Sequence, residues 1–184
     1  ASTTCTTSGV TTTTGNLFIA SVGFCCATFT SVTDSKSNTY TDSIAELIVA
    51  ETHGLQQFKE NGAGGAAHTF TLTGGSALFF ATLSVSEISG AVTSSALDQI
   101  ATDTDASGTS HATASTSTTA QANELLYGFG TSGLSTTYTT DTGAGWTELT
   151  NEPTDADEGL LTGFRVVSAT GTFAYTYTTG SSVD

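Results

Sequence analysis

Apolar and polar residues alternate along much of the chain, and this alternation predicts β-strands. Near the C-terminal end, Phe173, Tyr175 and Tyr177 alternate with Ala and Thr, as in a strand with one buried face. Residues 17–25 are instead continuously apolar, which is typical of a strand that is covered on both faces. Residues 43–60 combine helical spacing with alternation, and we expect strands there.

Glycine and polar residues separate these runs and mark the predicted turns. The clearest hairpin is predicted for residues 67–88, with Gly74 and Gly75 as its turn. A polar turn is expected at residues 34–38, where Asp and Asn side chains can bond to the nearby backbone. A final hairpin is predicted for residues 160–178.

The predicted strands number about eight or nine, and strands do not alternate with helices. We therefore expect an all-β fold, a two-sheet antiparallel β-sandwich that is jelly-roll-like. The polar residues 89–120 would form a long connection with at most one short strand. Residues 15–184 are expected to form a single sandwich domain, preceded at residues 1–14 by a Thr-rich N-terminal strand or extension.

The two ends of the chain suggest assembly between subunits. No further apolar run follows residues 173–178 to pair with the last predicted strand, and residues 1–14 are β-prone but too polar for a core. Exposed strand edges pair readily with other chains, so we expect strand exchange or addition between subunits. The residues expected to take part are Val10, Thr11, Thr12, Thr13, Phe173, Tyr175 and Tyr177.

The charge balance excludes several partners. The chain has 17 Asp and Glu against three Lys and Arg, which gives a formal net charge of −14. Such a surface cannot neutralise phosphates, so neither nucleic acid nor an anionic membrane surface is an expected partner. The chain has no run of 18 apolar residues, so no membrane insertion is expected. The acidity is explained either by solubility or by binding of divalent cations.

Three cysteines fit an exported protein with one disulfide. Cys5 is expected to pair with Cys25 or Cys26, because adjacent residues on a strand point to opposite faces and only one of the two can face Cys5. The remaining thiol is either a small buried apolar side chain or a cross-link between chains.

A series of short strand and turn motifs covers most of the chain. In chain order they are GNLFIASVGF, SVTDSKSNTYT, GGAAHTFTLT, LSVSEISGAVTSSALD, ANELLYGFGT, GAGWTEL and FRVVSATGTFAYTYT. Together they resemble β-sandwich modules that recur in secreted bacterial surface proteins and in some phage structural proteins. The resemblance extends over residues 15–182 and implies the sandwich fold, without implying any catalytic or binding residue. Such modules usually continue beyond the last motif into one more apolar strand. The sequence departs from this pattern, since no apolar run follows residue 178, and the departure leaves open whether the sandwich is complete without another chain.

The sequence has no recognisable catalytic constellation. His53, His68 and His111 lack the spacing of zinc ligands, and no GxSxG motif surrounds a serine. We therefore expect no enzyme activity.

Two acidic loops are candidates for a structural Ca²⁺ site, because this ion prefers carboxylates on flexible loops. The alternative is that both loops are solvated acidic turns. The candidate ligands are Asp103, Asp105, Asp155, Asp157 and Glu158. No other cofactor is expected.

Exposed aromatic rings would allow a sandwich to bind polysaccharide, since such rings stack on sugar faces. The candidates are Trp146, Tyr138 and Tyr40, which lie beside predicted turns. The alternative is that the single Trp belongs to the core.

Two functions follow from these patterns. The first is a non-catalytic extracellular structural protein, a subunit of a fibre, surface layer or virion coat that assembles with copies of itself by strand exchange or addition. The second is a carbohydrate-binding or adhesion module of a larger cell-surface protein. Both functions predict a location outside the cell, at a cell or virion surface.

Overall fold

The protein is an all-β structure, as its sequence predicts. The computed structural model describes residues 2–104, 107–133, 136–152 and 158–182. These residues form fifteen strands and one short 3-10 helix, η1 (Thr142–Ala144). The strands are β1 (Ser2–Thr6), β2 (Val10–Thr12), β3 (Leu17–Cys25), β4 (Phe29–Asp34), β5 (Thr41–Val49), β6 (Thr52–Lys59), β7 (Gly65–His68), β8 (Phe70–Leu78), β9 (Ala81–Ile88), β10 (Ser110–Ala112), β11 (Glu124–Ser132), β12 (Tyr138–Thr140), β13 (Thr147–Glu152), β14 (Gly159–Val167) and β15 (Thr176–Thr179).

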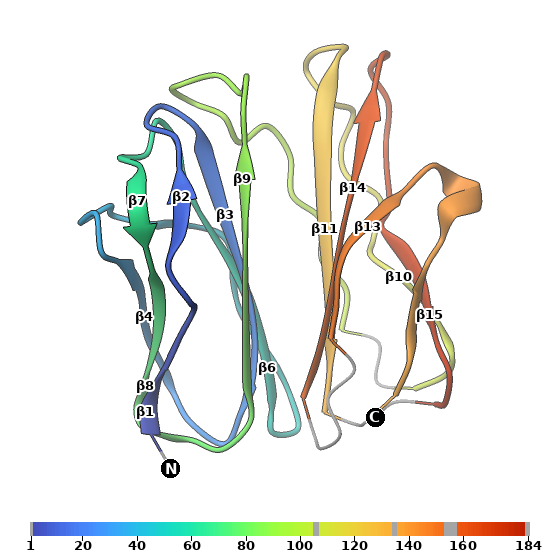
Figure 1. The fold of residues 1–184 in the computed structure, drawn as a ribbon. Coiled ribbons are helices and arrows are strands. Elements are labelled where there is room, and N and C mark those ends of the chain that lie inside the picture. Colours follow the sequence, from blue (N-terminus) through green and yellow to red (C-terminus); the bar gives the residue numbers. More distant parts are fainter. Residues whose placement is uncertain (1, 105–106, 134–135, 153–157, 183–184) are drawn as a thin grey trace.

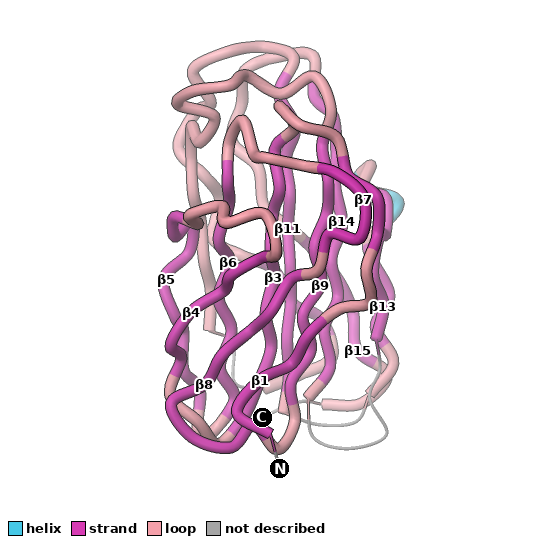
Figure 2. Tube along the Cα trace, turned by 60° about the vertical axis from the view of Figure 1, so that its left-hand side comes forward, coloured by secondary structure: helices cyan, strands magenta, loops and turns pink. Residues whose placement is uncertain are grey.

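The strands form five hydrogen-bonded sets that are stacked as layers (Figure 1). The N-terminal half contributes an outer layer, β1-β8-β4 with the pair β2-β7, and an inner sheet, β5-β6-β3-β9. Figure 2 shows β1, β8 and β4 in front of this inner sheet. The C-terminal half contributes an inner sheet, β11-β14-β13, and an outer sheet, β10-β15-β12. The two inner sheets face each other, since β11 contacts β6 and β14 contacts both β3 and β9.

Strand β3 is the central strand of the N-terminal half. All nine of its residues are buried, so the prediction of a strand covered on both faces is confirmed. Its even-numbered side chains, such as Phe24, pack against Leu72 of the outer layer. Its odd-numbered positions face the other inner sheet, where Gly23 on β3 and Gly54 on β6 leave room for the side chain of Thr131.

The core of the C-terminal half is aromatic, and its rings lie against glycines. Tyr138, Trp146, Leu161 and Tyr175 form its buried cluster. The rings of Trp146 and Tyr175 meet edge to face, with centroids 4.6 Å apart. A Cβ atom at Gly128 on β11 would lie only 2.7 Å from Cδ1 of Tyr175, so the ring needs a glycine opposite.

The number of strands differs from the prediction of eight or nine. Short polar strands such as β1 and β10 pair through their backbones, and no apolar alternation marks them in the sequence. The predicted turn at Gly74 and Gly75 is also wrong, because β8 runs through both residues. A Cβ atom at Gly74 would lie 2.8 Å from Cδ2 of Leu78, so this glycine permits close packing instead of a turn.

The predicted hairpins have mixed outcomes. Strands β8 and β9 belong to different layers, and so do β14 and β15, so neither predicted hairpin is present. Tyr177 lies against Gly130 of β11, which holds β15 over the face of the inner sheet instead of beside β14. The strands expected within residues 43–60 are present as β5 and β6, which pair with each other. The polar turn is present as well, since Oδ1 of Asp34 accepts hydrogen bonds from two backbone N–H groups.

Candidate functional site

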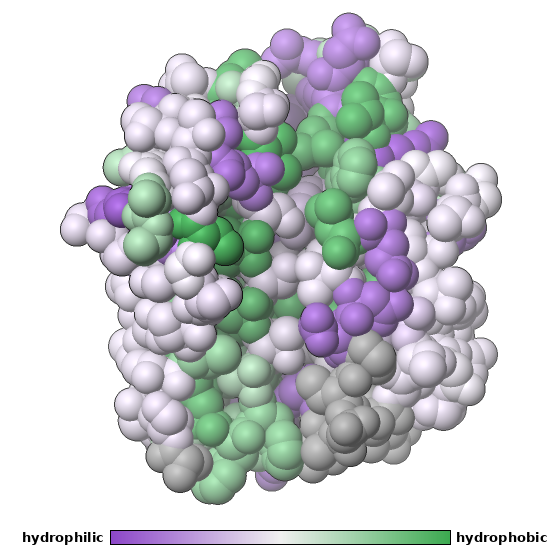
Figure 3. All heavy atoms as spheres, viewed as in Figure 1, coloured by the Kyte–Doolittle hydropathy of each residue, from purple (hydrophilic) through white to green (hydrophobic). Residues whose placement is uncertain are grey.

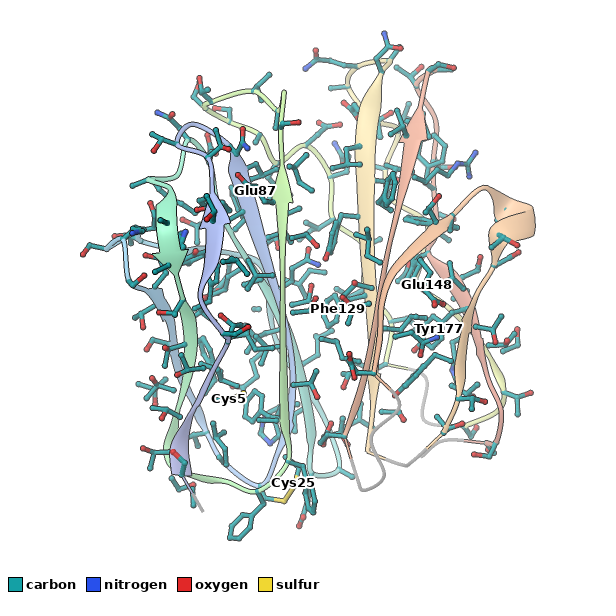
Figure 4. The ribbon with its side chains drawn as sticks, in the orientation of Figure 1. Cys5, Cys25, Glu87, Phe129, Glu148 and Tyr177 are labelled. Carbon is teal, nitrogen blue, oxygen red and sulfur yellow. A yellow bond between two sulfur atoms is a disulfide. The ribbon has the colours of Figure 1, made fainter. Side chains whose placement is uncertain are left out.

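The N-terminal segment pairs with its own chain. Strand β1 lies beside β8, and β2 pairs with β7, so the Thr-rich residues 1–14 contain two short strands. The backbone N–H of Thr13 donates to Oε1 of Glu87 (Figure 4) at 2.6 Å and ties the end of the segment to β9. Val10 and Thr11 are exposed, whereas Thr12 is buried. The segment is therefore part of the outer layer of this molecule.

The last strand is paired on both sides. Strand β15 lies between β10 and β12 of the same chain, so the expectation that its edge is uncovered is wrong. Tyr175 is buried and Tyr177 is half-buried. Phe173 is half-buried beneath Arg165, whose guanidinium carbon lies 5.4 Å from the ring centroid. The neighbour β10 comes from the polar residues 89–120, where few apolar residues reveal a strand.

A ladder of threonines continues the pairing beyond β10. The backbone N–H of Thr113 donates to the carbonyl of Tyr175. In the same way Thr116 donates to Phe173, and Thr119 donates to Gly171. Each Thr hydroxyl in turn accepts the backbone N–H of that same residue, at 3.0 to 3.2 Å. The signal that sequence reasoning missed is the repeat of Thr at every third position.

A buried polar cluster holds β2 against the turn at Asp34. Oγ1 of Thr12 and Nδ1 of His68 are 2.6 Å apart, and Nε2 of His68 lies 3.2 Å from Oδ2 of Asp34. Burial raises the pKa of Asp34, but hydrogen bonds from Asn38, Tyr40 and backbone N–H groups outweigh this and lower it overall. The side chains of His68 and Asp34 have no exposed surface that a substrate could reach, so we interpret this cluster as structural.

The aromatic residues predicted to bind polysaccharide do not form a platform. Trp146 and Tyr138 are each 4% exposed and pack inside the C-terminal core. Tyr40 lies in the other half, where its hydroxyl donates to Oδ2 of Asp34 at 2.8 Å. Because Trp146 and Tyr138 are buried and Tyr40 is half-buried in the other half, the prediction that these three residues form an exposed platform is wrong.

The disulfide also differs from the prediction. It joins Cys25 to Cys26 at one end of the molecule (Figure 4), and Cys5 keeps a free thiol whose pKa is raised by burial. The prediction assumed that adjacent side chains point to opposite faces. That assumption fails here because β3 ends at Cys25 and the backbone of Cys26 has a φ of 68°.

The acidic candidates do not form a metal site within the described residues. Asp103 lies in the connection before β10, and Glu158 is fully buried next to β14. Asp105, Asp155 and Asp157 lie outside the described residues. In the part of the chain that the structure describes, no group of three His, Cys, Asp or Glu side chains could hold a metal ion.

A groove of about 620 Å³ lies between the two halves. The inner sheet of the N-terminal half has four strands, and β6, β3 and β9 lie opposite β11 and β14. The remaining strand, β5, lines the groove with Ile44 and Leu47, whereas Phe58 comes from β6. Phe129 of β11 points into the space between the sheets (Figure 4). A groove of this size and character is typical of binding sites.

Exposed apolar side chains border the groove. Val92, Leu97 and Ile100 lie in the connection after β9, and Val166 lies near the end of β14. Figure 3, which views the molecule from the side of β9 and β13, shows further apolar residues between the two halves. Exposed apolar groups gathered around a concave site are characteristic of interaction surfaces.

Strand β11 has a free edge inside the groove. It is the end strand of its sheet, and its only ladder among the described residues is with β14. Every residue from position 123 to 132 lines the groove, so the groove follows the whole strand. The backbone N–H and C=O groups of such an edge form a template for another strand. The groove therefore runs along the unpaired edge of β11, and β5 is among the strands that line it.

The charged residues that line the groove are acidic. They are Asp98, Asp103 and Glu124, and no Lys or Arg is among the lining residues. Desolvation and the nearby charge of Asp98 raise the pKa of Glu124. The crowding of two carboxylates at the start of β11 gives this end of the groove a negative potential.

Comparisons of the chain with protein-family models, with curated proteins and with solved structures gave no match. Among the described residues, no helix has the length and apolar character needed to cross a membrane.

Proposed function

We propose that the protein is a non-catalytic structural subunit of an extracellular assembly, such as a fibre, surface layer or virion coat. Neighbouring subunits join it by β-strand addition, in which an extended segment pairs with the free edge of β11. The observation that carries this proposal is that a groove with apolar walls follows the whole of this edge strand.

The position beside β11 offers both kinds of contact that strand addition uses. The backbone of β11 supplies hydrogen bonds, which give affinity without regard to sequence. Side chains on one face of an added strand would meet Ile44, Leu47 and Phe58 of the opposite sheet. An added strand with apolar residues at every second position would place them all against these side chains. A shift by one residue would turn them away, so this contact sets the register of the added strand.

The surface and the cysteines support an extracellular location. A disulfide persists in oxidising compartments, and the strong excess of Asp and Glu keeps a Thr-rich surface soluble. Sugar binding at Trp146, Tyr138 and Tyr40 has no support from their positions, since none of them forms an exposed platform.

Synthetic peptides test strand addition directly. One peptide has four Thr-Val repeats, and its control has the same composition with Thr and Val arranged in pairs. Trp146 lines the groove and is the only Trp of the chain, so its fluorescence reports binding. We expect the alternating peptide to bind at least tenfold more tightly, because only alternation presents one apolar face.

Two matched variants of the protein locate the binding. Ile100 lines the groove and Ile48 does not, and both are 55% exposed. Ile100→Asp is expected to weaken peptide binding at least tenfold, and Ile48→Asp to leave it unchanged. Failure of both peptides to bind, or equal loss in both variants, would sink the proposal.

A further inference from the structure

We infer that the strand accepted by the groove comes from a different chain, in which Lys or Arg residues flank a segment of alternating apolar residues. This inference rests on the proposed function, and it adds the chemical class of the partner. It depends on the charges around the groove and on the charges of the chain itself.

The first argument is the charge at the end of the groove where β11 begins. Asp98 and Glu124 lie together where β11 begins, and Asp103 lies in the connection that borders the same groove. The backbone N–H of Gln121 donates to Glu124, and that of Ala120 donates to Asp98. Both carboxylates are therefore held in place. A cationic side chain arriving with the added strand would relieve the repulsion between them.

The second argument concerns a copy of the same chain as partner. The chain has only three cationic side chains, Lys36, Lys59 and Arg165, against 17 acidic ones. Lys36 donates to the carbonyl of Ala66, and Arg165 lies over Phe173. Two such chains repel each other, and no strand among the described residues carries more than one of these three cations.

The third argument is that the free strand edge alone is indiscriminate. Backbone pairing would accept any extended segment, including strands that cause aggregation. An acidic border disfavours acidic segments, copies of this chain among them, and so selects partners by repulsion as well as attraction.

Three peptides with the same core of four Thr-Val repeats test the inference. Their flanks are two Lys, two Ser or two Glu at each end, and Trp146 fluorescence reports binding to the full chain. We expect the Lys-flanked peptide to bind at least tenfold more tightly than the Glu-flanked one in low salt. The difference is expected to shrink at high salt, because exposed charges are then screened.

Charge-matched variants assign the effect to the groove. Glu124→Gln is expected to reduce the preference for Lys flanks severalfold, whereas Glu152→Gln removes an exposed carboxylate of β13, outside the groove, and is expected to leave it unchanged. Equal binding of all three peptides would overturn the charge inference and leave strand addition standing. Absence of binding by all three would overturn the proposed function itself.

The purified chain provides a separate check. It is expected to have the mass of one chain, 18.6 kDa, in light scattering at physiological salt. If the wild type instead forms particles of several times that mass, and these dissociate in the Ile100→Asp variant, the groove is occupied by a second copy of the chain. That result would overturn the inference. Such particles would still agree with strand addition at β11.

Discussion

The two halves of the molecule fill their outer cores in different ways. In the N-terminal half both layers contribute large side chains, and Phe24 of β3 and Leu72 of β8 are fully buried. In the C-terminal half one layer contributes rings such as Tyr175, and the facing strand β11 contributes glycines such as Gly128. The first core is therefore sensitive to lost volume, and the second is sensitive to added volume.

This difference shows that glycines can occupy buried positions on a strand when large rings lie opposite them. Gly128 and Gly130 alternate along β11 just as Tyr175 and Tyr177 alternate along the facing segment. Each ring covers one glycine, so at these two positions the apolar surface is supplied by the rings. Three predictions test the contrast between the two cores, and a fourth tests the threonine ladder beside the aromatic core.

The largest effect is expected from removal of volume in the N-terminal core. Phe24→Ala is expected to lower the free energy of unfolding by about 3–5 kcal/mol, measured by denaturant titration. The control is Phe79→Ala, because Phe79 is 64% exposed and its loss should change stability by less than about 0.5 kcal/mol. Similar losses in both variants would contradict the assignment of Phe24 to the core.

The second prediction concerns alkaline pH and the aromatic core. Burial raises the pKa of Tyr175 to about 12, above the ordinary value of 10.0. The folded chain therefore keeps this proton after the unfolded chain has lost it, so stability falls as the pH rises from 10 to 12. The loss is at most roughly 3 kcal/mol, from about 1.4 kcal/mol per unit of pKa difference.

The comparison for this prediction is the Tyr175→Phe variant. Tyr40 and Tyr138 also have raised pKa values and contribute to the loss in both proteins. The free energy of unfolding should therefore fall less steeply with pH in the variant than in the wild type. Identical slopes would mean that Tyr175 ionises as easily in the folded chain as in the unfolded chain.

The third prediction adds volume to the aromatic core. Gly128→Ala is expected to destabilise the chain by about 1–3 kcal/mol, because the new methyl group meets the Tyr175 ring near its attachment to the backbone. Gly143→Ala is the control, since its Cβ would approach only the flexible side chain of Asp141, at 3.2 Å. If the two variants have equal thermal midpoints, the rings do not depend on glycine.

Sequence reasoning succeeded where a strand has an apolar pattern of its own. The continuous apolar run of β3 and the alternation within β5 and β6 were both interpreted correctly. It failed where pairing partners lie far apart in the chain. β15 pairs with strands from positions 110–112 and 138–140, and alternation within a strand does not encode which strands become its neighbours.

The groove was missed for the same reason. The motif that forms β11 was recognised as a strand, but its free edge depends on which strands lie beside and opposite it. The position of Tyr138 was misjudged because Gly159, which makes room for its ring, belongs to a residue type that was interpreted as a turn signal.

The smallest effect is expected from the threonine ladder, which holds the segment after β10 to the chain leading into β15. Thr116→Val keeps the shape of the side chain and removes the hydroxyl that accepts the N–H of Phe173 at 3.0 Å. The expected loss is about 1 kcal/mol, the net value of one such hydrogen bond. Amide hydrogen exchange should show faster exchange at Phe173, because its N–H then has no acceptor.

The control is Thr118→Val, at an exposed neighbouring position, which should leave the free energy of unfolding and the exchange rate of Phe173 unchanged. Equal protection of Phe173 in the two variants would mean that the backbone bonds alone hold this segment, and that the three-residue repeat of Thr has no structural significance.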